Sequence, residues 1–312
     1  MVEKNLAKLA YQTLQQGKSI AGFAHKEFST KLMEMLVPDA LPKTSPVTKE
    51  LLIELRNSIN ELEKIDWQEA EEGIYPKSQL FDSPWIDWIT KYPLIWLDMP
   101  SIWARRRKKK TSVFPKQIKL ESYPDYYLQN FHHQTDGYLS DHSAKIYDIQ
   151  VEILFNGTAD SMRRRVISPI RQGISKFHNE GSSNLKVLDV ATGTGRTLHQ
   201  LRSALNGVEF SGLDLSSSYL KQASKYLNNR EGDIVQLVKG NAEQIPFPEN
   251  SFHGISCVFL FHELPRKARD NVIKECFRIL KPGGVFIIAD SIQLNDSPKF
   301  KLVMENFHNF FH

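Results

Sequence analysis

Residues 187–197 read Val-Leu-Asp-Val-Ala-Thr-Gly-Thr-Gly-Arg-Thr, and their types and spacing suit a small-molecule site. The apolar run from Val187 to Val190 predicts a short buried strand, and Arg196 to Leu205 suits a helix. Between them, Gly193 and Gly195 lack a Cβ, so a ligand can approach the backbone closely. The first turn of the following helix would point unpaired N–H groups at that ligand, which favours a ligand with an anionic end.

A second strand-like run, from Val208, ends in Asp214, 25 residues after Asp189. An acid at the tip of the second strand of a βαβ unit can bind the hydroxyls of a ribose. Alternatively, Asp214 is a favourable acid ahead of a helix from Ser216 to Tyr226, and both roles can hold at once. Leu198 stands where a dinucleotide fingerprint has its third glycine, which argues against a nicotinamide dehydrogenase.

Three more blocks follow in order. A strand-like run from Ile234 to Val238 precedes the loop Gly-Asn-Ala-Glu-Gln-Ile-Pro-Phe-Pro, and an apolar run from Gly254 to Leu260 precedes Phe-His-Glu-Leu. From Arg278 to Asp290 we expect a helix end, a turn at Pro-Gly-Gly and then a strand. The glycine turn alone is a weak signal, so the set of blocks carries the prediction.

In this order the five blocks resemble the class I S-adenosylmethionine-dependent methyltransferases, in particular the small-molecule branch with the quinone-ring C-methyltransferases and the type 11 methyltransferase domain. The resemblance covers roughly residues 140–312. It implies an α/β fold, in which a Rossmann-like methyltransferase sheet follows an α-helical N-terminal region. It also implies S-adenosylmethionine as cofactor and a small methyl acceptor, such as a quinone or another lipid-like ring.

The resemblance implies a set of cofactor-binding residues. Its members are Tyr147, Asp189, Ala191, Gly193, Gly195, Asp214, Leu215, Asn241, Ala242 and Phe259. The turn at 191–195 would hold the methionine part, while Asp189 would order this turn and reach the amino group through water. Asp214 would bind the ribose hydroxyls.

By the same resemblance, Leu215 would lie against the adenine, and Asn241 and Ala242 would meet its edge. Residues 259–262 would line the floor near the transferred methyl group. Tyr147 would belong to a lid helix over the cofactor; its alternative role is that of a partly buried aromatic on an amphipathic helix.

The sequence departs from the family pattern at three places. Ala191 replaces the usual glycine and crowds the turn slightly, and Asn241 replaces the usual aspartate, which keeps the acceptor but loses the charge. The usual Phe-Asp pair is Phe252-His253 here. None of these changes forbids cofactor binding.

A sulfonium methyl group is already activated, so catalysis consists mainly of aligning the acceptor, the methyl and the sulfur. A general base is needed only when the acceptor has a proton to lose. His262 is the candidate catalytic residue because it follows the fourth strand at the carboxyl edge, and because its neutral form can accept a proton. A histidine that is merely hydrogen-bonded in the loop is the alternative, and Glu263 is the second choice.

The amino-terminal half predicts helices. Apolar residues recur at helical spacing over 3–37 in two pieces broken near Gly17, and Ser45-Pro46 suits the start of a helix that ends near Gly73. Residues 121–180 would link the halves. There, His132, His133, Tyr138 and His142 are candidates for an acceptor pocket, although each is more often structural.

Residues 84–110 hold four of the five tryptophans, and then Arg-Arg-Arg-Lys-Lys-Lys. Tryptophan and clustered bases suit a peripheral membrane contact. Alternatively, the aromatics pack a helical domain and the bases are a solvated helix end. Pro84, Pro93 and Pro100 are expected to cut the segment short. Separate blocks of aromatics and bases disfavour nucleic acid, although an RNA-modifying enzyme that uses 105–110 stays an alternative.

Length and composition limit the number of domains and the classes of protein to which the chain can belong. A length of 312 residues predicts about two domains, and a net charge of +4 is too small to argue for a nucleic-acid enzyme. Cys257 and Cys276 are expected to be reduced core residues rather than metal ligands, so we predict no metal and a cytoplasmic location. The start of the chain lacks the apolar segment of a secretion signal, and no apolar run is long enough for a membrane span.

We therefore expect an α-helical region over 1–120, linking and lid helices over 121–180, and the cofactor-binding domain over 181–312. The family's sheet has seven strands, whereas five are predicted here, followed by a helix from Phe300, so the last hairpin is missing. This loss would expose a strand edge. It motivates the alternative of a catalytically silent S-adenosylmethionine-binding protein or fragment.

Overall fold

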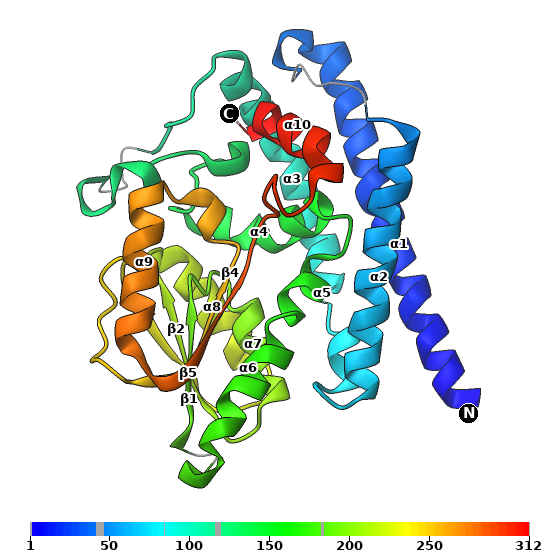
Figure 1. Cartoon of the computed structure of the whole chain (residues 1–312). Coiled ribbons are helices and arrows are strands. Elements are labelled where there is room, and N and C mark those ends of the chain that lie inside the picture. The colour runs from blue at the N-terminus through cyan, green and yellow to red at the C-terminus, as the bar shows by residue number, and fades with distance from the viewer. Residues whose placement is uncertain (1, 42–46, 84, 116–119, 182–183, 312) are drawn as a thin grey trace. The chain divides into compact units, whose positions relative to one another are not determined.

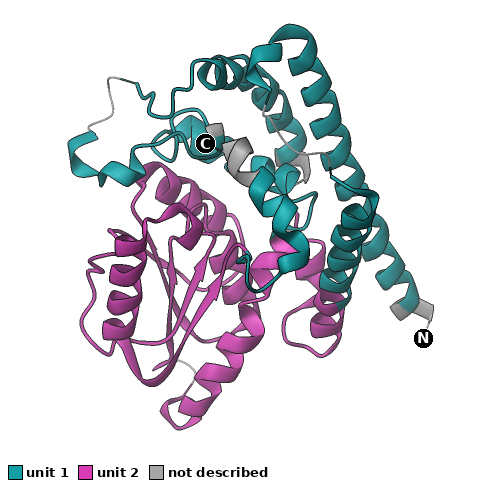
Figure 2. Cartoon of the chain, turned by 45° about the horizontal axis from the view of Figure 1, so that its top comes forward, with its two compact units in different colours: residues 1–64, 84–159, 292–312 teal, residues 65–83, 160–291 magenta. Residues whose placement is uncertain are grey.

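The computed structural model describes residues 2–41, 47–83, 85–115, 120–181 and 184–311. They form two compact units, coloured teal and magenta in Figure 2. Unit 1 comprises 1–64, 84–159 and 292–312, and unit 2 comprises 65–83 and 160–291. Each unit thus combines separate stretches of the chain. The units are defined by contacts between residues, so they do not test the predicted domains over 1–120, 121–180 and 181–312, which stay a prediction.

Unit 2 is built on a parallel sheet. Its strands are β1 (Lys186–Val190), β2 (Glu209–Asp214), β3 (Gln236–Lys239), β4 (Phe252–Val258) and β5 (Leu280–Ala289). All neighbouring strands pair in parallel in the order β3-β2-β1-β4-β5, which confirms the Rossmann-like methyltransferase sheet (Figure 1). The chain reverses its direction of winding between β1 and β4, and ligands of open α/β sheets bind at the carboxyl ends of such strands.

Helices pack closely on this sheet. They are α6 (Ile167–Ile174), α7 (Arg196–Ala204), α8 (Ser217–Asn228) and α9 (Arg266–Ile279), and the short helix α5 (Ala159–Arg164) precedes α6. Figure 1 shows α9 on one side of the sheet and α6 on the other. A Cβ added to Gly173 of α6 would lie 2.3 Å from the Val285 side chain, so only glycine allows this approach. Both cysteines are free and buried, as expected for core residues.

The start of β5 differs from the prediction. We expected a turn at Pro-Gly-Gly before the strand, but the strand begins at Leu280, which pairs with Phe252. The register then shifts, so that Val285 is opposite Gly254, and Gly283 takes a positive φ of 83°. The turn residues are therefore an irregularity within β5, because pairing with β4 begins before them.

Unit 1 is helical. Its helices are α1 (Val2–Leu36), the first part of α2 (Lys49–Glu71), α3 (Trp85–Arg107), α4 (Asp141–Leu154) and α10 (Lys301–Phe311). The short 3₁₀ turns of the two units span Pro38–Ala40, Lys77–Leu80, Leu120–Ser122, Asp125–Tyr127, Phe131–His133, Ser175–Glu180, Phe261–Glu263 and Pro298–Phe300. The expected helix start at Ser45-Pro46 lies outside the described residues.

Two helices are longer than the sequence predicted. The break at Gly17 is wrong, because α1 runs through it; one interior glycine costs a helix only about 1 kcal/mol. Pro93 and Pro100 do not cut the segment either, since both lie inside α3. Packing of Trp88 and Ile95 on Ile149 of α4 stabilises α3 despite the hydrogen bonds that the prolines remove.

Tryptophans of α3 supply the core of unit 1. Trp88 and Trp103 are buried, Trp103 against Met33 and Ala40, and the Trp96 ring lies 5.0 Å from His25. These contacts correspond to the packing alternative for the aromatics. Lys108 to Lys110 are exposed. Among the described residues, no helix combines the length and the apolar character that crossing a bilayer requires.

Candidate functional site

The glycine turn follows β1 and has an unusual backbone. Ala191, Gly193 and Gly195 all take positive φ, of 57°, 57° and 82°. A Cβ added to Gly193 would meet only the Ala191 carbonyl oxygen, at 4.0 Å, so there is open space beside the backbone for a ligand. A Cβ on Gly195 would instead lie 3.2 Å from Ala223 of α8. Gly195 therefore also allows two helices to pack closely.

Asp189, in β1, holds this turn in place. Its carboxylate accepts hydrogen bonds from Thr192 Oγ1 at 2.8 Å and from Ser256 Oγ at 2.6 Å. Burial raises the pKa of Asp189 to about 6, while these two hydrogen bonds act in the opposite direction. Asp189 is thus placed to order the turn, and its contact with the cofactor's amino group stays a prediction. Sequence reasoning missed Ser256, whose β4 position opposite Asp189 follows from the strand register.

Asp214 joins the end of β2 to the glycine turn. Its Oδ2 accepts a hydrogen bond of 2.8 Å from the Gly193 N–H, and its Oδ1 accepts one of 2.8 Å from the Ser216 N–H. Loss of surrounding water raises the pKa of Asp214 to about 6, and these backbone hydrogen bonds oppose that rise. Ser216, not Asp214, caps α8, through a hydrogen bond from the Tyr219 N–H. A carboxylate has further acceptor capacity for ribose hydroxyls.

The loop after β3 carries Asn241 and Ala242, both half-buried, as is Leu215 after β2. The Asn241 side-chain oxygen accepts a hydrogen bond of 2.9 Å from the Glu243 N–H, so it stabilises a turn. The Arg278 guanidinium of α9 donates to the carbonyls of this loop at 2.9 Å. The loop is therefore fixed by the protein itself. The contacts of Asn241, Ala242 and Leu215 with adenine stay predictions.

Phe259 follows β4 directly and has a positive φ of 60°. Its N–H donates to the Ala289 carbonyl at 3.0 Å, which helps to hold this strained residue. The Arg163 guanidinium carbon lies 5.6 Å from the centre of the Phe259 ring. Sequence reasoning missed Arg163, since three successive arginines at 163–165 gave no sign of which one faces the end of the sheet.

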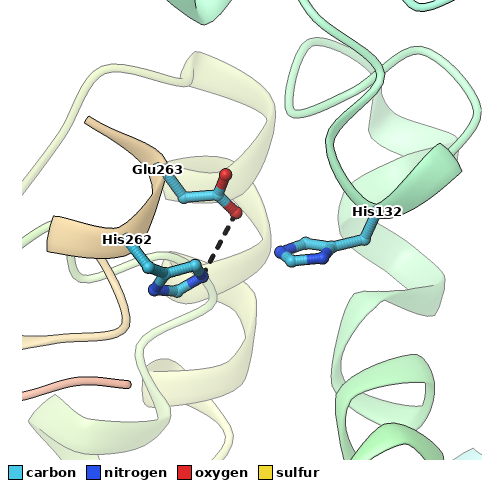
Figure 3. A group of neighbouring side chains, drawn as sticks. All are labelled: His132, His262 and Glu263. Atoms are coloured by element: carbon cyan, nitrogen blue, oxygen red, sulfur yellow. Dashed lines mark ion pairs between the residues drawn. The ribbon is translucent and has the colours of Figure 1, made fainter. Parts of the chain in front are cut away.

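His262 lies in the 3₁₀ turn Phe261–Glu263 after β4, between two carboxylates. Its Nδ1 is 2.8 Å from Asp290, the residue that follows β5, and its Nε2 is 3.4 Å from Glu263 (Figure 3). Burial lowers its pKa, but the hydrogen bonds to Asp290 and Glu263 outweigh burial and raise the pKa to about 9. The expectation of a neutral imidazole is therefore wrong near pH 7. Any role of His262 in catalysis is that of a positioned cation, and it stays a prediction.

Tyr147 lies on α4 and belongs to unit 1, whereas the other predicted cofactor residues belong to unit 2. Its ring centre is 6.1 Å from that of Tyr138, which in turn stacks on Phe131 at 5.2 Å. Half-buried aromatic rings thus form a continuous group within unit 1. The lid role of Tyr147 and the acceptor roles of His132, His133, Tyr138 and His142 stay predictions.

Comparison with known proteins identifies the family. A family model described as a methyltransferase domain matches residues 187–284. A demethylmenaquinone methyltransferase of Thermotoga maritima is 33% identical over 157 residues, which are 50% of this chain and 62% of that protein. A second one, of Lactiplantibacillus plantarum, is 32% identical over 175 residues, 55% of this chain and 68% of that protein. A sterol 24-C-methyltransferase of Pneumocystis carinii is 35% identical over 111 residues, 35% of this chain and 28% of that protein.

The chain therefore spans about two thirds of the length of the two demethylmenaquinone methyltransferases. The matched residues include the glycine turn, Asp214 and the loop after β3. Together with the order of the parallel sheet, these similarities show that the chain belongs to the class I S-adenosylmethionine-dependent methyltransferases and is similar to their quinone-ring C-methyltransferases.

Proposed function

We propose that this chain transfers the methyl group of S-adenosylmethionine to a small, lipid-like ring, with a demethylated quinol as the first acceptor to test. The observation that carries the proposal is the similarity to two demethylmenaquinone methyltransferases, joined to a glycine turn with open space at Gly193. Asp189 and Asp214 flank this turn, and their carboxylates support a cofactor site of the required polarity.

When bound, S-adenosylmethionine would supply a sulfonium methyl group, which a ring carbon of the quinol would attack in line; S-adenosylhomocysteine would leave, and the proton of that carbon would pass to water. The protein's part is to orient and to exclude water. Asp214 would hold the ribose hydroxyls, and the turn at 191–195 would hold the methionine part. His262 is protonated near neutral pH, so it would not take the acceptor's proton, but its charge suits an acceptor oxygen.

A labelled methyl group tests this proposal. The full chain is incubated with S-adenosylmethionine carrying a deuterated methyl group and with demethylmenaquinol, and the quinol fraction is analysed by mass spectrometry. We expect a labelled menaquinol, no product with Asp214→Ala, and full product with the matched control Asp233→Ala, which removes an exposed acid. Cofactor binding without product on quinol or sterol acceptors would overturn the proposal in favour of a silent cofactor-binding protein.

We further propose a cytoplasmic enzyme that contacts membranes peripherally through residues 84–110. Ile89 and Leu97 of α3 are 70% and 76% exposed, and Lys108 to Lys110 are exposed beyond its end, which supports the proposal. We expect sedimentation with phosphatidylserine vesicles but not with phosphatidylcholine vesicles. Replacing the three lysines by glutamine should remove about 1 kcal/mol of binding free energy each. Equal sedimentation of the wild type with both kinds of vesicle would contradict an electrostatic contact.

A further inference from the structure

Helix α1 has apolar residues on two sides, although a surface helix needs only one apolar face to pack on its own domain. It is the long blue helix of Figure 1. One face buries Tyr11, Gly22 and Met33, which lie within about 40° of one another around the helix axis. The outer face of α1 lies roughly opposite. Its large apolar side chains are Leu6, Leu9, Ile20 and Phe23, which are exposed by 59%, 59%, 69% and 50%.

The outer face of α1 follows a heptad pattern. Steps of three and four residues alternate along it, and every residue reached is exposed: Leu6, Leu9, Thr13, Gln16, Ile20, Phe23 and Glu27. Two helices that pack in a coiled coil meet along positions with this spacing. A Cβ added to Gly17, beside these positions, would meet no atom within 4 Å. The backbone of a second helix can therefore come close to the middle of this face.

The outer face is self-complementary. Two apolar residues come first, Thr13 and Gln16 lie in the middle, and two apolar residues follow. A two-fold axis perpendicular to the helix, between Thr13 and Gln16, would set two identical helices antiparallel. The resulting pairs between the two copies are Leu6 with Phe23, Leu9 with Ile20, and Thr13 with Gln16. Every large apolar side chain of this face thus gains an apolar partner, and the polar residues meet each other.

The polar middle of the outer face distinguishes a protein partner from a lipid surface. The Thr13 hydroxyl donates to the Leu9 carbonyl at 2.9 Å, and its oxygen keeps lone pairs that can accept a hydrogen bond. The Gln16 amide of a second copy can donate that bond, whereas the acyl chains of a lipid cannot. Burial of an unpaired amide costs free energy. A second copy of α1 therefore fits this face better than a bilayer does.

The charge at one end of the outer face selects the direction of the partner helix. In a parallel pair, Glu27 of one copy would lie opposite Glu27 of the other, where like charges repel each other. In the antiparallel pair, the two Glu27 side chains lie at opposite ends of the interface. The exposed ion pair of Glu27 with Lys31, at 2.7 Å, then needs no rearrangement. The antiparallel arrangement therefore has the more favourable distribution of charge.

We propose that two copies of this chain associate through the outer faces of their α1 helices, packed antiparallel about a two-fold axis. Each copy contributes four large apolar side chains, which makes a small interface, so we expect a dissociation constant in the micromolar range. The inference goes beyond the proposed function, since none of the predicted cofactor-binding residues lies between positions 6 and 27.

Paired charges test the dimer and its direction together. The full chain is studied by sedimentation equilibrium at concentrations from about 1 to 100 µM, which bracket the expected dissociation constant. Leu9→Glu and Ile20→Lys each bury an unpaired charge twice per dimer, so each should weaken association by roughly 100-fold or more.

An equimolar mixture of the two variants should associate again, to within about tenfold of the wild type. In the antiparallel mixed dimer the introduced acid lies opposite the introduced base, while the unchanged Leu9 and Ile20 still meet. A parallel dimer would place both introduced charges opposite apolar residues, so it would not recover. Recovery in the mixture therefore reports the direction of the helices.

A matched control replaces an isoleucine outside the outer face. Ile234→Lys introduces the same base at a side chain that is 97% exposed, so the dissociation constant should stay that of the wild type. Leu9 and Ile20 are exposed in a single copy, so their substitution should not change the melting temperature of the dilute, monomeric protein. These two measurements separate a lost interface from a lost fold.

Three results would overturn the inference. One is a wild type that stays monomeric up to about 100 µM; if that monomer sediments with phosphatidylcholine vesicles and Leu9→Glu does not, the face binds lipid instead. Another is a wild-type dimer that neither Leu9→Glu nor Ile20→Lys weakens, since it would use a different surface. The last is a mixture of the two variants that fails to associate, which would exclude the antiparallel pairs.

Discussion

Two buried carboxylates of unit 2, Asp66 and Asp160, have opposite surroundings. Asp66 accepts hydrogen bonds from the Tyr75 hydroxyl at 2.7 Å, from Ser161 at 3.0 Å and from two atoms of Arg164 at 2.7 and 2.5 Å. Arg164 also donates to a carbonyl oxygen, so this group is closed. Asp160 instead forms ion pairs with two arginines, Arg163 and Arg196.

The two groups use the same kind of ion pair to join different elements of unit 2. The closed group around Asp66 joins the segment 65–83 to α5, so its use is structural. The group around Asp160 joins Arg163 of α5 to Arg196 at the start of α7. Adjacent arginines, Arg163 and Arg164, thus pair with different carboxylates, because successive helix residues point about 100° apart.

We expect the largest change in the free energy of unfolding when the group around Asp66 is disrupted. Asp66→Ala leaves the Arg164 guanidinium buried without its carboxylate, so we expect the free energy of unfolding to fall by about 3–5 kcal/mol. Urea denaturation followed by circular dichroism measures it. The fraction that remains folded should bind S-adenosylhomocysteine with unchanged affinity. A loss of affinity in the folded fraction would break the distinction between the two groups.

A second closed group is His262 with Asp290 and Glu263. The pKa of His262 is about 9 in the folded protein and about 6.5 when unfolded, so the folded form binds its proton more tightly. The resulting stabilisation is fully present below pH 6.5 and is lost as the pH rises through 9. We expect the free energy of unfolding to fall by roughly 2–3 kcal/mol between these limits. The fall should be absent in His262→Gln; an equal fall in that variant would contradict the assignment.

Cofactor affinity at the site of Asp189 and Asp214 should change at acidic pH rather than at alkaline pH. The pKa values of Asp189 and Asp214 are both raised to about 6, so both carboxylates gain protons below that pH. Because the amino group of the cofactor is cationic, affinity should be constant above pH 7 and weaken by up to about tenfold per pH unit below 6. Calorimetric titration with S-adenosylhomocysteine from pH 5 to 8 measures this. A flat profile would show that neither carboxylate binds in its charged form.

The smallest expected effect concerns Ala191. A residue with a Cβ at a φ of 57° is strained by about 1–2 kcal/mol, and glycine is not. Ala191→Gly gains some of this energy but adds freedom to the unfolded chain, so we expect a net stabilisation of about 1 kcal/mol. A rise in melting temperature would confirm it. A lower melting temperature would mean that contacts of the Ala191 methyl group outweigh the strain.

Local patterns carried most of the fold prediction. The run Val187 to Val190 is buried in β1, the glycine turn has the expected positive φ values, and each predicted strand exists. Such features depend on a few successive residues. The errors at Gly17, Pro93 and Pro100 have the opposite origin, because packing between distant helices overrides a local preference.

The site was predictable only where a motif names the residue. Asp189 and Asp214 could be found because they lie at or next to the ends of strands in a known order. The protonation of His262 could not be found, since Asp290 is 28 residues away and comes close only when β4 and β5 pair. The ion pair of Asp160 with Arg196 could not be found either, because the two residues are 36 positions apart and meet only in the folded chain.

The segment 65–83 has a practical consequence for anyone who shortens this protein. Asp82 lies 2.8 Å from His199 of α7 and also contacts Arg230, and Gln79 donates to the Gln200 carbonyl. A protein cut just before β1 would lose these partners and leave His199 and Arg230 without the Asp82 carboxylate. It should be insoluble or readily digested by protease, whereas co-expression of the missing piece would restore a resistant core.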